Sequence, residues 1–290
     1  MHPLIEKLLA EAPVVVDGGW GTELQARGLP SGGCPDEWNL SHPVEVEQVP
    51  RAYVQAGSRI VLTNTFRANR VSLADFGLAD QAAAIARAGV KISRRAADGQ
   101  AYVFATMGPS GKMLVAGEIK PQRLADAFRE QAEALADGGA DALVVETMAE
   151  LEEARLALEA ARDTGLPTVA CMVFDSGAKL DRTMMGVTPE QAAETLTAAG
   201  ADVIGANCGQ GIAGYVPIAR RMRAATQRPL WIKANAGLPE MVDNQVVYRT
   251  SPEEFASHAR ELRSAGADFI GGCCGTNPDY IRALAKELRP

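Results

Sequence analysis

Short apolar, β-branched segments alternate with longer amphipathic, alanine-rich segments along the whole chain. This alternation is typical of a parallel α/β fold, in which each strand is followed by a helix that packs on the sheet. Eight such units in a chain of this size predict a single (β/α)8 TIM barrel. A doubly wound open sheet is the alternative, but no GxGxxG motif follows the first expected strand. We expect strands near 13–18, 58–64, 101–107, 141–146, 167–173, 202–207, 230–235 and 268–273, and helices near 44–56, 79–97, 121–138, 149–163, 189–199, 213–226, 252–265 and 277–288.

The connections between these segments are of two kinds. Three helix-to-strand connections are short and alike, and each has a Gly that can end the helix and an Asp before the strand. Strand-to-helix connections are longer, and in a TIM barrel they form the face that carries the active site. No linker or change of composition divides the chain, so residues 1–290 are expected to form one domain. The long strand-to-helix connections are 19–43, 108–120, 174–188 and 236–251.

The composition is that of an ordinary globular protein and argues against several kinds of partner. Of the 290 residues, 47% are hydrophobic and 22% are charged, and the formal net charge is -7. Because no stripe of basic residues is present, nucleic acid is not expected as a partner. No apolar stretch approaches the roughly 18 residues of a membrane span, and the first residues do not resemble a secretion signal, so we expect a soluble, cytoplasmic protein. Five cysteines, an odd number, favour a reducing compartment in which thiols stay free or bind metal.

Three of the cysteines lie at or just after the ends of expected strands. Cys273 and Cys274 lie at the end of the strand at 268–273, and Cys208 follows the strand at 202–207. If these strands are neighbours in one parallel sheet, three sulfur atoms converge on one rim, which describes a zinc site with an open fourth position. Successive residues of a regular strand point to opposite faces, but the flanking glycines allow the backbone to leave β geometry. The alternatives are buried structural cysteines, or a Cys273–Cys274 pair that cycles between dithiol and disulfide in a redox-sensing barrel.

Two carboxylates are expected at the same rim. Asp17 ends the first strand and is followed by Gly18 and Gly19, which let a ligand approach the backbone closely. Glu146 directly follows the apolar residues of the fourth strand, where an unpaired carboxylate would be costly. The two could form a general acid and base pair, but beside a thiophilic metal they favour recognition of a substrate ammonium group. For Asp17 a capping role in a turn is the alternative.

Other polar residues at strand ends are less specific. Thr65 follows the second strand and Asn235 ends the seventh, where they can line a pocket or cap a turn. None of the three histidines lies at an expected strand end, so a Ser/His/Asp site is not predicted.

These motifs together resemble the zinc-dependent homocysteine S-methyltransferase family. The resemblance implies that Cys208, Cys273 and Cys274 bind zinc, with the sulfur of homocysteine in the open position. It also implies that Asp17 and Glu146 hold the ammonium group, while backbone amides near Gly18, Gly19 and Thr65 receive the carboxylate. The motifs run in the family's order: Asp17-Gly18-Gly19 with Gly21-Thr22, Thr63-Asn64-Thr65-Phe66, Glu146-Thr147, Asn207-Cys208, Asn235-Ala236-Gly237-Leu238-Pro239 and Gly271-Gly272-Cys273-Cys274-Gly275-Thr276.

The methyl donor differs among branches of that family, which use betaine, S-methylmethionine or a methylcorrinoid. The betaine branch carries aromatic residues at the positions matching Arg67 and Thr147, as expected for a site that holds a quaternary ammonium. A cation and a hydroxyl stand there in this chain, so betaine is disfavoured. The segments 34–40 and 63–70 look most similar to the homocysteine module of cobalamin-dependent methionine synthase.

Because 290 residues leave no room for folate and cobalamin modules, we expect a separate methylcorrinoid protein to dock on the barrel face. S-methylmethionine as donor and a different small thiol as acceptor are the alternatives. The loops 108–120 and 174–188 carry cationic and flexible apolar residues, and either form the docking surface or act as a substrate lid.

Overall fold

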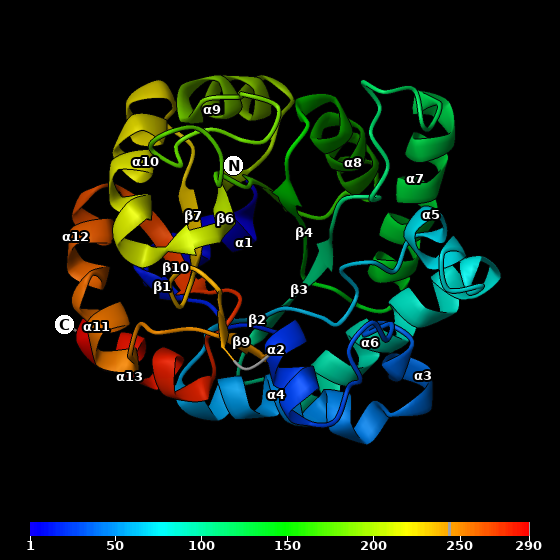
Figure 1. Cartoon of the computed structure of the whole chain (residues 1–290), viewed down its shortest axis with the longest axis horizontal. Helices are drawn as coiled ribbons and strands as arrows, with labels where there is room; N and C mark the ends of the chain where they lie inside the picture. Colours follow the sequence, from blue (N-terminus) through cyan, green and yellow to red (C-terminus); the bar gives the residue numbers. More distant parts are fainter. Residues whose placement is uncertain (243–244, 290) are drawn as a thin grey trace.

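A computed structural model describes residues 1–242 and 245–289. Eight parallel strands lie at its centre with helices around them (Figure 1). The barrel strands are β1 (Val14–Val15), β2 (Ile60–Val61), β3 (Tyr102–Met107), β4 (Ala142–Met148), β5 (Thr168–Met172), β6 (Val203–Gly211), β7 (Leu230–Asn235) and β10 (Ala267–Gly272). The helices are α1 (Pro3–Leu9), α2 (Gly21–Ala26), α3 (Trp38–Ser41), α4 (Pro43–Ala56), α5 (Arg70–Ala74), η1 (Ala79–Gln81), α6 (Ala82–Ala97), α7 (Pro121–Asp137), α8 (Leu151–Asp163), α9 (Pro189–Ala198), α10 (Ile212–Ala225), α11 (Pro252–Ser257), α12 (Ala259–Ser264) and α13 (Pro278–Leu288).

The strand order shows a closed barrel. The hydrogen-bonded order is β1-β10-β7-β6-β5-β4-β3-β2, which follows the chain around the sheet. A parallel bridge between Val16 and Ile60 joins the two ends of this sheet. Next to it, Asp17 N donates a hydrogen bond to Ile60 O at 3.1 Å. The predicted (β/α)8 barrel and its eight strand positions are therefore confirmed.

The barrel has two apolar cores, which follow from the alternation of side chains along each strand. Val14 and Val16 point into the barrel, where they pack in one cluster with Phe104, Trp231 and Phe269. The intervening residues, such as Val15 and Val61, belong to the larger cluster that the sheet forms with the surrounding helices.

The sequence analysis did not anticipate that α1 closes one end of the barrel. Its Ile5 and Leu8 are fully buried and pack in the same cluster as the interior strand residues. His2 caps this helix, because its Nδ1 accepts a hydrogen bond from Leu4 N at 3.2 Å. The N–H of His2 also contacts Asp202, which lies just before β6, so α1 sits at the N-terminal ends of the strands. The opposite end is left for the long loops.

Two expectations about local structure need correction. The helix expected over 252–265 is two helices, α11 and α12, which meet at His258. The loop expected over 236–251 contains a short antiparallel hairpin of β8 (Glu240–Val242) and β9 (Gln245–Val247). Residues 243–244, between these two strands in the sequence, lie outside the described part of the chain. Among the described helices, none is both long and apolar enough to cross a membrane.

Candidate functional site

The three predicted cysteines converge at the C-terminal ends of β6 and β10. The sulfur atoms of Cys208, Cys273 and Cys274 all lie within 4.8 Å of one another, and the Cys208 and Cys274 sulfurs are 3.8 Å apart. Two thiolates on one tetrahedral zinc, each with a Zn–S bond of about 2.3 Å, are separated by roughly 3.8 Å. The cluster therefore has the donor type and spacing of a metal site.

The backbone turns each cysteine toward this point. Cys208 lies in the left-handed region with φ 64°, at an irregularity in the β6–β7 pairing that spans Cys208 and Gly211. Strand β10 ends at Gly272, after which the N–H of Cys273 donates to Ala234 O at 2.6 Å. The departure from β geometry that the glycines predicted is thus observed at both strand ends.

The neighbouring amide residues hold the cysteines in place. Asn235 Oδ1 accepts a hydrogen bond from Cys274 N at 3.1 Å, and Asn235 does not line the cavity described below. Asn207 Oδ1 accepts from Thr147 N at 2.7 Å, and its Nδ2 donates to the Thr147 hydroxyl at 2.7 Å. These bonds stabilise Thr147 at φ 62°, a strained value for a β-branched residue.

The pKa values of the cluster thiols are raised, which favours the protonated form. A hydrogen bond from Cys273 lowers the pKa of Cys208, but the hydrogen bond with Cys274 and burial outweigh it and raise the pKa to about 12. The pKa of Cys273 is also raised well above its usual value, by its hydrogen bond to Cys208 and by burial. A bound cation would have to displace these protons. Cys34 and Cys171 are buried in the apolar clusters and do not belong to the group of three cysteines that could hold a metal ion.

Glu146 lies beside the cysteines with its carboxylate in a defined orientation. Its Oε1 accepts a hydrogen bond from the Thr106 hydroxyl, and its Oε2 accepts from Asn207 Nδ2 at 3.2 Å. Burial raises the pKa of Glu146, against the lowering effects of the Lys233 charge and the Thr106 hydrogen bond. The side chain is almost buried but still lines the cavity, so it remains accessible to a small ligand.

Asp17 lies deeper than the sequence analysis supposed. Its Oδ1 accepts a hydrogen bond from Lys233 Nζ, and its Oδ2 accepts from Trp20 Nε1 at 2.8 Å and Leu62 N at 2.7 Å. The residue is fully buried, and it does not line the cavity. Direct contact of Asp17 with a substrate ammonium stays a prediction.

Of the residues expected near a substrate carboxylate, Gly18 and Gly19 line the same cavity, whereas Thr65 is fully buried and is not part of its wall. A Cβ atom on Gly19 would lie 2.6 Å from the Cys273 carbonyl oxygen, so only glycine fits there. The Gly19 N–H donates to Thr276, whereas the Gly18 and Thr65 N–H groups have no acceptor among the described residues. The Thr65 side chain is buried and bonds to Thr63 and to the Thr106 carbonyl oxygen. Among the described residues, the Gly18 amide is therefore the one of these three that both lacks an acceptor and belongs to a residue of the cavity wall.

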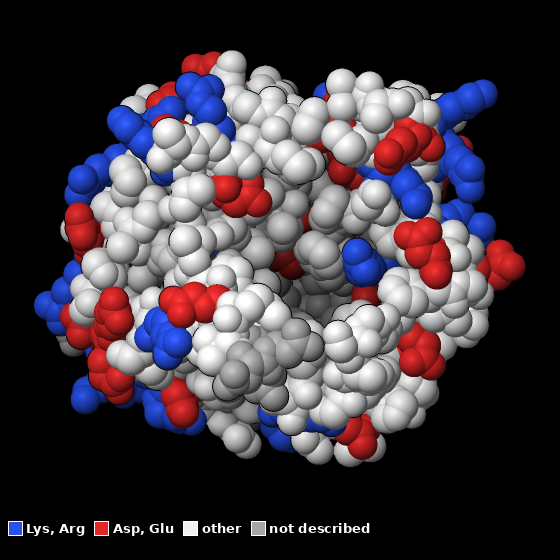
Figure 2. Space-filling view, in the orientation of Figure 1, with Lys and Arg blue, Asp and Glu red and all other residues white. Residues whose placement is uncertain are grey.

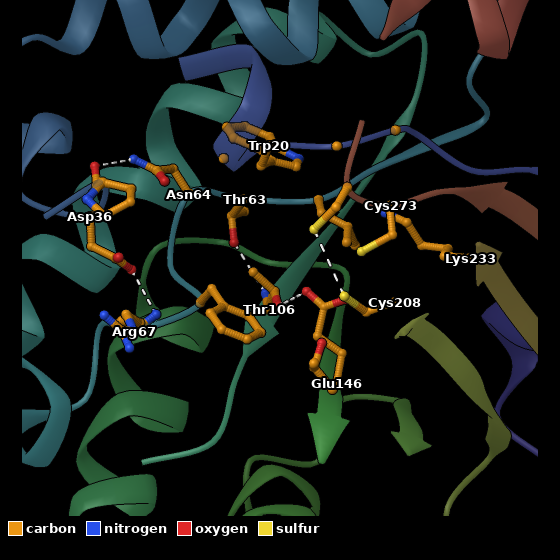
Figure 3. Close-up of a pocket in the computed structure, with 18 residues that line it drawn as sticks. Trp20, Asp36, Thr63, Asn64, Arg67, Thr106, Glu146, Cys208, Lys233 and Cys273 are labelled. Carbon is orange, nitrogen blue, oxygen red and sulfur yellow. Dashed lines mark hydrogen bonds between the residues drawn. The ribbon is translucent and has the colours of Figure 1, made fainter. Parts of the chain in front are cut away.

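Gly18, Gly19, Glu146 and the three cysteines of the cluster line a cavity of 340 Å³ at the C-terminal ends of the strands. Figure 3 shows the cysteines at one end of it and Asp36, Asn64 and Arg67 at the other. At that second end, Asp36 Oδ1 accepts a hydrogen bond from Arg67 N at 2.9 Å, while the Arg67 side chain is exposed. Burial raises the pKa of Asp36 to about 7, although that hydrogen bond acts in the opposite direction.

The loop 108–120 is fastened to the barrel by carboxylates of α8 and the residue before it. Ser110 N donates to Glu153 Oε1 at 2.7 Å. The N–H groups of Leu114 and Val115 donate to the two oxygens of Glu150, each at 3.1 Å. No residue of the loop 108–120 is among the described residues that line the cavity.

The loop 174–188 is fastened in a similar way. Gln210 Nε2 donates to the carbonyl oxygens of Phe174 at 3.2 Å and Leu180 at 2.7 Å. Arg221 of α10 pairs with Asp181 at 2.6 Å. This loop also stays outside the described cavity wall.

Exposed apolar side chains gather on three of the long loops. We call this set the apolar rim. Figure 2 shows a hollow at the middle of the face turned to the viewer, bordered mostly by uncharged surface, with many of the charged side chains farther out. The apolar rim consists of Met113, Val115, Met184, Leu238, Met241 and Val246.

Sequence reasoning missed two polar residues that shape the site, Lys233 and Thr106, and assigned no role to Asn207. Lys233 is a single cation within the apolar strand β7, a signal that could have marked it. Thr106 and Asn207 orient Glu146. Asn207 belongs to the Asn207-Cys208 motif, but nothing in the sequence around Thr106 distinguishes it from an ordinary strand residue.

Comparisons with known proteins agree with this geometry. A family model described as homocysteine S-methyltransferase matches residues 14–288. Methionine synthase of Mycobacterium leprae is 32% identical over 301 residues, which cover 97% of this chain and 24% of that protein. Methionine synthase of Mycobacterium tuberculosis is 32% identical over 302 residues, covering 97% of this chain and 25% of that protein. The chain thus spans about a quarter of the length of these relatives.

Solved structures show the same fold. The metallated form of the homocysteine methyltransferase MmuM from Escherichia coli superposes with a TM-score of 0.79 at 23% identity, over 94% of this chain and 95% of that one. Its oxidized form gives a TM-score of 0.82 at 22% identity, over 98% and 99% of the two chains. The fold and the family that the motifs predicted are both confirmed. This chain belongs to the homocysteine S-methyltransferase family.

Proposed function

We propose that this protein is a zinc-dependent enzyme that transfers a methyl group to the thiolate of homocysteine and so forms methionine. The observation that carries the proposal is the cluster of Cys208, Cys273 and Cys274 at one end of a cavity that Glu146 also lines. The family match over nearly the whole chain supports the same reaction.

The residues present fit a zinc ion. Three cysteine sulfurs at tetrahedral spacing are a common donor set for catalytic zinc, which keeps one position for a substrate. Zinc bound there would hold the acceptor sulfur as a thiolate, whereas a free alkyl thiol with a pKa of about 8.5 is mostly protonated at pH 7. In the transfer, the sulfur forms a bond to the methyl carbon while the bond from that carbon to the donor breaks.

The other residues would bind and orient the amino-acid part of the substrate. Glu146 is placed to accept the ammonium group, because it lines the cavity and its carboxylate is oriented by Thr106 and Asn207. The amide of Gly18, which lines the cavity and has no acceptor among the described residues, is suited to the carboxylate. Gly19 lets the backbone pack closely against the Cys273 carbonyl oxygen at the edge of this site.

A methylcorrinoid protein is the donor that we propose, with the apolar rim as its docking surface. A lid would line the cavity that it closes, but the loops 108–120 and 174–188 are fastened away from it. Apolar side chains with exposures such as 62% for Met184 and 66% for Val115 are typical of a surface that another protein covers. Such a reaction would take place in the cytoplasm.

The test is a comparison of methyl donors. Zinc-loaded protein is incubated with homocysteine and, in parallel, with a methylcorrinoid protein, methylcobalamin, S-methylmethionine or betaine, and methionine is measured. We expect methionine with the corrinoid donors, none with betaine, and none from Cys273→Ala with any donor. Cys34→Ala is the matched control and should keep its activity. Efficient turnover with S-methylmethionine alone would reject the corrinoid donor, and no methionine from any donor would reject methyl transfer to homocysteine.

A further inference from the structure

The cavity contains an ammonium group that belongs to the protein itself. Lys233 of β7 lines the cavity although its side chain is only 2% exposed, and its Nζ donates to Asp17 Oδ1. A lysine ammonium has three N–H donors, and Asp17 is the one side-chain acceptor found for it among the described residues. A charged group is therefore already present where the sequence analysis expected the ammonium group of a substrate.

The bond to Lys233 changes what Asp17 can do. One oxygen of Asp17 is engaged by Lys233, and the other accepts two hydrogen bonds, from Trp20 and Leu62. Because Asp17 is fully buried and outside the cavity wall, its charge is compensated within the protein. Of the two carboxylates, only Glu146 is then left to face a ligand.

The net charge around the cavity floor follows from these three residues. In their charged forms Asp17, Glu146 and Lys233 carry a net charge of minus one, whereas the two carboxylates without the lysine would carry minus two. Burial lowers the pKa of Lys233, but the negative charges of Asp17 and Glu146 outweigh it and raise the pKa, so the lysine is charged at neutral pH. The internal cation thus cancels one of the two negative charges that these carboxylates contribute to the attraction of an ammonium group.

We propose that Lys233 sets acceptor specificity: it weakens selection for an ammonium group, so the cavity also binds small alkyl thiols that carry a carboxylate but no amino group. The inference rests on the proposed function, because it concerns the same acceptor site. The simplest acceptor of this class is 4-sulfanylbutanoate, which is homocysteine without its amino group. Its thiol and carboxylate can take the places described for homocysteine, and Glu146 would remain solvated or bind a counterion.

Four proteins test the role of charge: the wild type, Lys233→Met, Asp17→Asn and the double variant Asp17→Asn/Lys233→Met. The measured quantity is the ratio of dissociation constants for 4-sulfanylbutanoate and homocysteine, obtained by calorimetry on zinc-loaded protein without a methyl donor. The net charge is minus two in Lys233→Met, minus one in the wild type and the double variant, and zero in Asp17→Asn. Preference for homocysteine should therefore be highest in Lys233→Met, intermediate and similar in the wild type and the double variant, and lowest in Asp17→Asn. Each unit of charge within several Å should change the ratio by roughly tenfold.

Two controls keep the outcome clear. Lys91→Met removes an exposed lysine of α6 and should leave the ratio unchanged. If Lys233→Met does not fold, Asp17→Asn and the double variant still differ only at Lys233, and the ratio should rise from the first to the second. A ratio that is equal in all four proteins would overturn the role of Lys233, even if methionine is formed. Absence of methionine with every donor, but with the expected order of ratios, would overturn the proposed reaction and leave this inference standing.

Discussion

Lys233 and Asp17 form a hydrogen-bonded ion pair inside the barrel, although 216 residues separate them in the sequence. Both side chains are withdrawn from solvent, at 2% and 0% exposure. A buried charge needs a partner, because burial of an isolated ion is costly. The pair ties the end of β1 to the middle of β7 and fixes the electrostatics of the cavity floor.

We first predict that removing either partner destabilises the protein more than removing both. Lys233→Met or Asp17→Asn should lower the free energy of unfolding by about 3–5 kcal/mol, because each leaves polar groups buried without their partner. The double variant should lose less than the sum of the two single losses. Urea denaturation measures these values, with Lys91→Met as the control. Additive losses would show that the two side chains do not stabilise each other.

The second prediction concerns metal content. One zinc per chain is expected in the wild type, and Cys208→Ala, Cys273→Ala and Cys274→Ala should each lose most of it, because the three sulfurs form one cluster. Cys171→Ala is a suitable control, since Cys171 is buried in the barrel interior away from that cluster. Elemental analysis of protein purified under reducing conditions measures the zinc content per chain. Full zinc retention in Cys273→Ala would contradict the assignment.

A third prediction concerns the role of Glu146 in binding. Glu146→Gln keeps the shape but removes the charge, and a hydrogen bond to a charged group is worth roughly 1.5–3 kcal/mol. Affinity for homocysteine should fall by roughly tenfold to a hundredfold, with zinc content unchanged. Glu153→Gln is the matched control, because Glu153 is also a buried carboxylate but holds the loop 108–120 outside the cavity. Unchanged homocysteine affinity in Glu146→Gln would mean that Glu146 is structural.

Stability should also depend on pH through Asp36. Burial raises the pKa of Asp36 from 3.8 to about 7 in the folded protein. The folded state therefore binds a proton more tightly than the unfolded state, and this contribution is fully present below pH 4 and is lost as the pH rises through 7. At about 1.4 kcal/mol for each unit of pKa difference, the effect amounts to up to about 4 kcal/mol.

The variant Asp36→Asn isolates this effect, because its side-chain oxygen can still accept the hydrogen bond from Arg67 N. Its stability relative to the wild type should rise between pH 4 and pH 8. Denaturant unfolding of the two proteins at several pH values measures the difference. A difference that does not change with pH would contradict the raised pKa.

Much of the fold and the cysteine cluster could be predicted because the signals are local. Apolar strands and glycine helix ends mark each βα unit, and Cys208, Cys273 and Cys274 lie at or just after the C-terminal end of a strand whose place in the barrel is fixed by its order. The ion pair of Asp17 with Lys233 could not be predicted in this way, since it depends on side-chain directions in strands far apart in the sequence. The apolar plug formed by α1 was missed for a similar reason, because its amphipathic pattern does not identify the surface that it covers.

The last prediction concerns the apolar rim. It distinguishes the docking of a protein methyl donor from the entry of a small-molecule methyl donor into the cavity. Met184→Asp and Val115→Asp each place a charge on an exposed apolar position, outside the cavity wall. A charge in the centre of an apolar interface must be desolvated when the partner binds, so methyl transfer from a corrinoid protein should fall at least about tenfold. Transfer from free methylcobalamin should stay within about twofold, because the cavity is unaltered. Gln100→Asp introduces the same charge just before β3, at the N-terminal end of the barrel, and should affect neither donor. Equal losses with both donors in Met184→Asp would indicate that the loop 174–188 closes over the cavity during the reaction, and no loss with either would remove this rim from the docking surface.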